Sequence, residues 1–279
     1  MTPPYSNAGQ LSRSPHDAED ICEQLTSYVA ATFGPHPFAA GLGMAELEAL
    51  FPDFLGLSLS FRYLQAAAQK DVIFDAMREN REVPIEVEMM NAVGNFLTWD
   101  ECGGVDLMQA EGKSALPKIL DTGRFHSNMF RADAHKILGR PIQSNYRPET
   151  RKYLTGIYDG LASTDVVVRC AHMVAFEIHA SAVLESLWKS IVDTTGLAPE
   201  ELPYFARHVG GADPAEKYHV EMTQRLVERV VPVEEQTRFR EEFRAAYQLH
   251  VDWCSRFARK PAEGRTDDER AATRQSATA

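Results

Sequence analysis

Apolar residues recur at every third or fourth position over most of the chain, which is the spacing that gathers them on one face of a helix. No run alternates cleanly between apolar and polar residues, so the pattern predicts no strand. Short connections between the helical segments favour an all-α fold, a single helical bundle. Helices are expected at about 17–33, 45–50, 53–80, 84–101, 124–138, 148–162, 165–195, 198–209, 214–230 and 233–259.

Glycine and proline residues separate these segments. Glycine weakens helix continuity, and proline lacks the backbone N–H that a helix interior needs. We therefore expect a break at Pro52, between the helices at 45–50 and 53–80. Residues 102–123 make the longest connection for which the pattern predicts no helix. Other breaks are expected at Gly34-Pro35, Pro84, Gly103-Gly104, Gly139, Gly196, Gly210-Gly211 and Pro232.

The two ends of the chain contain few large apolar residues. Neither end can bury enough surface to offset the entropy lost on ordering it. We expect residues 1–16 and 261–279 to be disordered tails and residues 17–260 to form the helical domain. A length of 279 residues allows two domains but does not require them.

Composition and charge narrow the functional classes. Hydrophobic residues make up 44% and charged residues 25%, as in ordinary soluble proteins. No run of about 18 apolar residues predicts a membrane span, and the first residues lack the pattern of a signal peptide. The net charge of -11 disfavours a nucleic-acid partner, which requires a basic face. Widely spaced cysteines favour reduced thiols in a cytoplasmic protein: Cys22, Cys102, Cys170 and Cys254.

Carboxylates and histidines on apolar helix faces are the most informative feature of the sequence. In the helix at 165–195, the apolar stripe passes through Glu177. An ionised carboxylate buried alone costs several kcal/mol, so it must pair with a cation, stay protonated or bind a metal. Glu216 and His219 lie three residues apart and therefore share one face of the helix at 214–230.

Other helices repeat this arrangement on their apolar faces. Taken singly, a core histidine usually has a hydrogen-bond partner, and a core glutamate is usually salt-bridged. Together, three carboxylates and three histidines on separate helices are what a carboxylate-bridged two-metal site needs, and such donors suit iron or manganese. The remaining candidates are Glu101, His126 and His208, with His250 more typical of a core histidine.

Four short motifs resemble the haem-oxygenase-like diiron oxidases and oxygenases, a bacterial family. The resemblance covers roughly residues 85–230. It rests on F-L-T-W-D-E-C-G-G at 96–104, R-F-H-S-N-M-F-R-A-D-A-H-K-I-L-G at 124–139, A-F-E-I-H-A-S-A at 175–182, and L-P-Y-F-A-R-H at 202–208 followed by E-K-Y-H-V-E-M at 216–222. It implies a helical fold like that of haem oxygenase with a non-haem diiron centre.

The resemblance also implies which residues bind the two irons. A first site would use Glu101, His126 and Glu177, and a second would use His208, Glu216 and His219, with Glu177 able to bridge. His135 is an alternative to His126, because an apparent insertion separates Glu101 from His126. Asp213 is an alternative to Glu216, because the last motif of the family usually reads His-x-x-x-Asp-x-x-His and G-G-A-D-P-A intervenes here. Its six-residue offset from His219, however, does not place the two on one helix face. Asp100 points about 100° away from Glu101, so one of the two should face inward.

The function implied is dioxygen activation by two iron ions, with a small amino acid or amine as substrate and N-oxygenation favoured. Oxidative C–C cleavage or desaturation of an amino or fatty acid is the alternative within the family. The resemblance leaves room for an external electron donor and for a homodimer. The sequence is also compatible with a metal-free binding protein or with a thiaminase-like hydrolase that uses a cysteine nucleophile, although no cysteine has an evident partner. Arg169 and Arg207 adjoin the expected ligand helices, and we interpret both as solvated surface residues.

Overall fold

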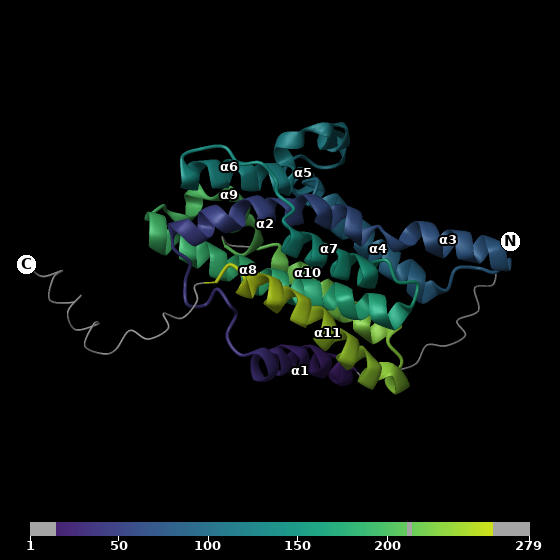
Figure 1. Cartoon of the computed structure of the whole chain (residues 1–279). Coiled ribbons are helices and arrows are strands. Elements are labelled where there is room, and N and C mark those ends of the chain that lie inside the picture. The colour runs from purple at the N-terminus through teal and green to yellow at the C-terminus, as the bar shows by residue number, and fades with distance from the viewer. Residues whose placement is uncertain (1–14, 211–213, 259–279) are drawn as a thin grey trace, which may run out of the picture.

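The computed structural model describes residues 15–210 and 214–258, and within these ranges it contains eleven α-helices and no strand (Figure 1). This confirms the predicted all-α fold. The tails predicted at 1–16 and 261–279 fall outside the described residues except for Pro15 and His16, which begin the first helix. The helices are α1 (Pro15–Phe33), α2 (Met44–Gln65), α3 (Ala68–Glu79), α4 (Ile85–Asp100), α5 (Gly104–Glu111), α6 (His126–Leu138), α7 (Pro148–Leu161), α8 (Val166–Thr195), α9 (Pro203–His208), α10 (Glu216–Val230) and α11 (Gln236–Ser255).

Helix α8 is the centre of the bundle, and α2, α4, α7, α9, α10 and α11 all pack against it. It begins where the Asp165 side chain accepts hydrogen bonds from the backbone N–H groups of Val167 and Val168, and it ends at Gly196, whose φ of 69° is left-handed. By length and composition α8 could cross a membrane, but 67% of its most apolar window is buried inside the fold. Burial on this scale is typical of a core helix.

The predicted break at Pro52 was wrong. Helix α2 runs through Pro52 without interruption and ends at Gln65, so the actual break falls at Ala66 and Ala67. The missing N–H costs one helical hydrogen bond, and complete burial of Leu50, Phe51 and Leu55 on either side offsets that cost. Periodicity alone could not show this, because the compensation comes from tertiary packing.

Residues 102–125 form an excursion from the bundle, which lies above α2 and α6 in Figure 1. The excursion contains α5 and two short 3-10 helices, Lys113–Leu120 and Thr122–Arg124. Its two ends meet, because the N–H of His126 donates to the carbonyl oxygen of Glu101 at 3.1 Å. At Gly103, φ is 74° and a Cβ would lie 2.6 Å from the Arg124 carbonyl oxygen, so this closure requires glycine.

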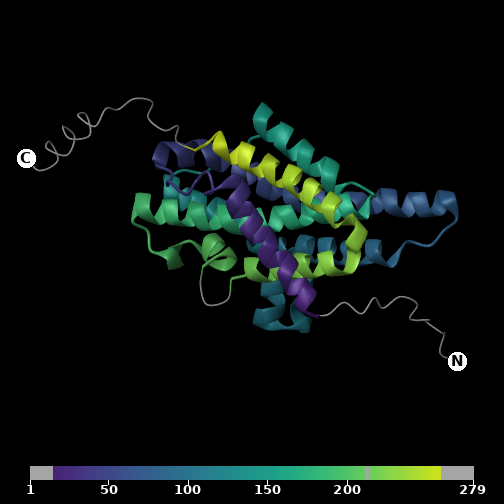
Figure 2. The same ribbon diagram turned by 90° about the horizontal axis from the view of Figure 1, so that it is seen from below.

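Helix α1 crosses obliquely over α10 and lies beside α11 (Figure 2), and residues 34–43 then lead back to α2. This segment is fastened to α8 by two hydrogen bonds at Leu42. Its N–H donates to Ser190 Oγ at 3.1 Å, and its carbonyl oxygen accepts from Thr194 Oγ1 at 2.9 Å. The segment therefore lies along α8 and brings His36 against the helix.

Candidate metal centre

Five helices deliver carboxylates and imidazoles to one region of the core. These side chains come from the end of α4, the first residue of α6, the middle of α8, the end of α9 and the first turn of α10. All six residues predicted as ligands lie there, in two groups whose potential ligand atoms lie within 4.8 Å of one another. The groups are Glu101, His126 and His208, and Glu177, Glu216 and His219.

The first group is held by local hydrogen bonds. His126 is fully buried, and its Nδ1 lies 3.3 Å from Glu101 Oε1. The rings of His126 and His208 meet edge to face with centroids 4.6 Å apart. His208 Nδ1 donates to the carbonyl oxygen of Tyr204 at 2.7 Å, one turn earlier in α9. A proton on Nδ1 leaves the Nε2 lone pair of His208 available to a metal.

The second group is centred on His219. Its Nε2 lies 2.9 Å from Asp100 Oδ2, while its Nδ1 faces Glu177 Oε2 at 3.6 Å and Glu216 Oε1 at 3.8 Å. A carboxylate on one ring nitrogen and two more facing the other is the arrangement in which a histidine binds a metal through the second nitrogen. Glu216 and His219 share the face that their spacing predicted.

The grouping differs from the one that the resemblance implies. His208 lies with Glu101 and His126, because α9 packs against α6, and Glu177 lies with Glu216 and His219. The backbone contact at the base of the excursion explains how His126 reaches Glu101 despite the intervening residues. The alternative His135 is exposed on α6, and the alternative Asp213 lies outside the described residues.

Burial dominates the electrostatics of this region. It raises the pKa of Glu177 to about 8 and that of Glu216 to about 7, and neighbouring carboxylates add to both shifts. Burial opposes the protonated form of His219, but the hydrogen bond to Asp100 and the charges of Glu216 and Glu177 together raise its pKa to about 10. The region therefore contains more acidic groups than its own cations neutralise.

Several buried polar atoms here have no hydrogen-bond partner among the described residues. They include Glu177 Oε1, Glu216 Oε2 and His126 Nε2, and also Asp100 Oδ1, which has only the distant ion pair with Arg207 at 3.9 Å. An unpaired buried polar atom costs about 1–3 kcal/mol, so several in one place call for a ligand. Two carboxylate oxygens and an imidazole nitrogen are donors that suit iron or manganese. The residues present thus fit a two-metal centre.

Asp100 has a role that the sequence did not reveal. Both Asp100 and Glu101 face inward, because α4 ends between them and the chain turns. Asp100 is 1% exposed, accepts from His219, and lies 3.9 Å from Arg207. Arg207 also forms an ion pair with Asp106, and its side chain is only 18% exposed, so the interpretation of Arg207 as a solvated residue was wrong.

Replacing Asp100 with asparagine is expected to weaken metal binding about 10- to 100-fold, since the charge that orients His219 is lost. The helical content should stay unchanged. Competition with a chelator measures the affinity. Asp106→Asn is the matched control, because Asp106 shares Arg207 with Asp100 but does not contact His219. Equal losses in both variants would show that Arg207, and not the contact with His219, sets the affinity.

A cavity adjoins the two groups. One side is lined by Glu101, Glu177, His208, Glu216 and His219. The enclosed space that a water-sized sphere can enter is small, about 50 Å³. The remaining wall is mainly apolar, and it is formed by Phe54, Leu57, Phe61, Phe176, Ala180, Val183 and Leu184, with Ser58, Tyr153, His179 and Tyr204 as polar members. A mainly apolar wall with a few polar groups is typical of pockets that bind small organic molecules.

A third cluster, His36, His179 and Cys254, was missed by the sequence reasoning. His36 Nε2 lies 3.2 Å from His179 Nε2, and Cys254 Sγ lies 3.7 Å from the same nitrogen. The N–H of Phe38 donates to His36 Nδ1 at 3.1 Å, so the proton of a neutral His36 is on Nε2 and points at His179. This tautomer makes the cluster a hydrogen-bonded unit. No sequence signal links residues so far apart.

Comparison with known proteins found similarity in structure and none in sequence. No protein-family model and no curated protein matches the sequence. Among solved structures, the chain is similar to a CADD-like protein of unknown function from Nostoc punctiforme. The TM-score is 0.63 at 14% identity, over 87% of this chain and 97% of that chain. What the two share is a fold. The comparison supports the all-α bundle over almost the whole domain, and the chemistry must be argued from the side chains.

Proposed function

We propose that this protein is a dioxygen-activating enzyme with two iron ions, acting on a small amino acid or amine, with N-oxygenation as the favoured reaction. The observation that carries the proposal is the pair of adjoining ligand groups, with unpartnered carboxylate and imidazole atoms beside an apolar cavity. The bundle that it shares with a CADD-like protein and the four sequence motifs add support.

The two groups would hold one metal ion each. Bound ferrous ions would supply the electrons with which dioxygen is reduced. The protein fixes the donors beforehand: the Tyr204 carbonyl sets the tautomer of His208, and Asp100 sets that of His219. Arg207 helps to keep Asp100 ionised, because burial raises the pKa of Asp100 but His219, His126 and Arg207 lower it further.

The cavity favours a small, partly apolar substrate. Its wall at Phe54, Phe61 and Phe176 would contact a hydrocarbon part, while Tyr153 and His179 offer hydrogen-bonding groups away from the ligand groups. Both kinds of contact would hold an amine or amino acid with its reacting atom toward Glu177. C–C cleavage or desaturation of an amino or fatty acid would use the same contacts and remains the second candidate.

The hydrolase alternative gains one feature from the structure, because Cys254 does have a histidine neighbour. Burial, however, raises the pKa of the Cys254 thiol well above its usual value, as it does for Cys170. Neither cysteine lines the cavity beside the ligand groups. A thiol that stays protonated and does not line the cavity is a poor nucleophile.

The experiment that tests the proposal is anaerobic loading with ferrous iron, followed by exposure to oxygenated buffer with a panel of amino acids and amines. We expect about two irons per chain and substrate-dependent oxygen uptake, with mass spectrometry showing a product heavier by one or two oxygen atoms. Products lighter by two hydrogens, or shortened by carbon loss, would select the second candidate. A chain that binds no iron under these conditions would overturn the proposal.

A further inference from the structure

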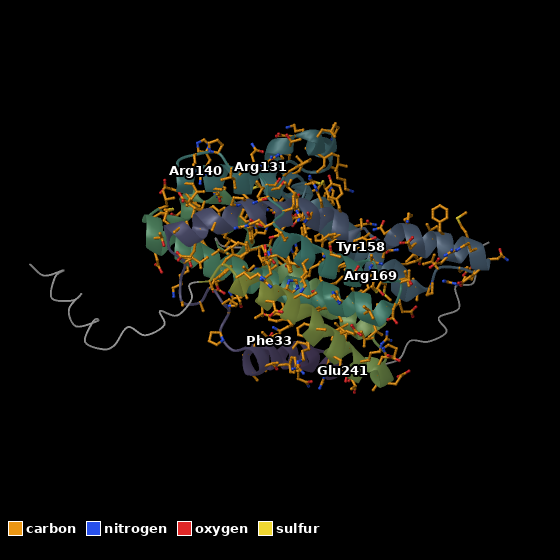
Figure 3. The ribbon with its side chains drawn as sticks, viewed as in Figure 1. Phe33, Arg131, Arg140, Tyr158, Arg169 and Glu241 are labelled. Carbon is orange, nitrogen blue, oxygen red and sulfur yellow. The ribbon has the colours of Figure 1, made fainter. Side chains whose placement is uncertain are left out.

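A second anomaly lies on α8, away from the metal centre. Arg169 was expected at the surface, but only 1% of it is exposed, and that interpretation was wrong. Figure 3 labels this residue in the half of the bundle nearer α3. There, Val166 on the same turn of α8 packs against a small cluster formed by Ala68, Val72 and Val87.

The guanidinium of Arg169 has one hydrogen bond and no anion. Its Nη1 donates to Asn91 Oδ1 at 2.8 Å, while Nε and Nη2 are buried without a partner. Within the described part of the chain, no carboxylate forms an ion pair with it. Burial lowers the pKa of Arg169 to about 10, so the side chain is still charged at neutral pH. A buried charge without a counter-ion is strongly unfavourable.

The positions of the unpartnered Nε and Nη2 atoms indicate which kind of ligand would bind to Arg169. Nε and Nη2 lie on the same edge of the planar guanidinium, and their N–H bonds run nearly parallel. Two parallel donors at this spacing match the two oxygens of a carboxylate, which is the bidentate geometry that distinguishes arginine from lysine. The remaining donor, Nη1, is used to hold the plane against Asn91.

Gly94 and Gln65 lie close to this edge of the guanidinium. A Cβ placed on Gly94 would lie 3.7 Å from Arg169 Nη2 and 2.9 Å from the backbone carbonyl oxygen of Gln65, so all three residues approach the same point. Gln65 is 1% exposed, and both its side-chain Nε2 and Oε1 are buried without partners among the described residues. Four unpartnered polar atoms thus belong to two buried side chains whose residues meet at Gly94.

We propose that Arg169, together with Gln65, whose backbone meets it at Gly94, forms a binding site for a small carboxylate anion. The guanidinium edge would hold both oxygens, and the amide N–H group of Gln65 would supply a further donor. The site is separate from the metal centre, because Arg169, Asn91 and Gln65 do not line the cavity there. Arg169 also precedes Glu177 by eight residues, a distance of about 12 Å along the helix. The inference does not depend on the proposed function.

The test measures thermal unfolding of the metal-free full-length chain with added sodium acetate, with sodium phosphate, and with sodium chloride at equal ionic strength. We expect acetate to raise the melting temperature of the wild type by about 2–4 °C over chloride. Arg169→Met should abolish this rise and should melt in chloride at or above the wild-type temperature, because the unneutralised charge is gone. Arg225→Met removes an equal charge from an exposed ion pair and should keep the acetate effect.

Two further variants keep the test decisive. Arg169→Lys retains the charge but loses the parallel edge, so it should bind acetate at least about tenfold more weakly in calorimetry. Gln65→Met should reduce the acetate effect, and it replaces Arg169→Met in the test if that variant does not fold. An acetate effect that survives in Arg169→Met would overturn the proposal, and so would an unchanged wild-type melting temperature in acetate. A rise with phosphate or chloride alone would show a different anion and also overturn it.

Discussion

Replacing Glu177 with glutamine is expected to reduce iron binding from about two ions per chain to one or none, and to abolish substrate-dependent oxygen uptake. Glu177 is 2% exposed and supplies one of the three donors of its group. Glutamine has nearly the same shape, so packing is retained while the charge and one strong oxygen donor are lost. Metal analysis after anaerobic loading and gel filtration gives the number of ions bound.

The matched control is Glu185→Gln, eight residues further along α8, where the side chain is exposed. This control should bind metal and consume oxygen as the wild type does. The number of metal ions that Glu177→Gln still binds also distinguishes two roles for the Glu177 carboxylate. One remaining ion would place Glu177 in a single group, whereas no remaining ion would show that its carboxylate bridges both. Retention of two tightly bound ions would refute the assignment of Glu177 as a ligand.

Metal affinity is expected to rise at least about tenfold for each pH unit between pH 6 and pH 8. With pKa values of about 8 for Glu177, about 7 for Glu216 and about 10 for His219, these groups carry protons that a metal ion must displace. Each displaced proton contributes a factor of about ten per pH unit. Calorimetry with ferrous or manganous ions, in buffers of different ionisation enthalpy, counts the protons released.

The metal-free fold should respond to pH in the opposite direction. The folded-state pKa of Glu177 lies above its usual value of 4.5, so its contribution is complete below about pH 4.5 and is lost as the pH rises through about 8. Glu216 and His219 have raised pKa values and act in the same sense. Rising pH should therefore remove the contribution of these three groups to the stability of the metal-free protein, and it should strengthen metal binding. Buried histidines whose pKa burial lowers act in the opposite sense, but only up to about pH 7, where a histidine of the unfolded chain loses its proton. A metal-free melting temperature that rises from pH 7 to pH 8 would contradict this linkage.

The sequence predicted the parts of the molecule that follow from helical periodicity. The stripe through Glu177 predicted a helix at 165–195, and α8 spans Val166–Thr195. The three-residue spacing of Glu216 and His219 placed both side chains on one face, as the structure has them. These features are local, because a helix fixes the relative direction of side chains three or four residues apart.

Features that depend on contacts between distant segments were not predictable in this way. Asp100 and Glu101 were expected to point in different directions, yet both face the centre because the helix ends between them. His36 meets His179 only because residues 34–43 fold along α8. Arg169 looks like a surface residue in sequence, and its burial arises where α8 packs against α4, since its Nη1 donates to Asn91 of that helix.

The backbone closure between Glu101 and His126 has a consequence for how this chain can vary. A 3.1 Å hydrogen bond joins the residues on either side of the excursion, so the two candidate ligands are neighbours as long as the contact between Gly103 and Arg124 is kept. The entropic cost of a longer flexible loop grows slowly, by only about 0.6 kcal/mol for each doubling of its length. Residues 105–123 are therefore a position where related chains could gain, lose or exchange a segment while the geometry of Glu101 and His126 is preserved.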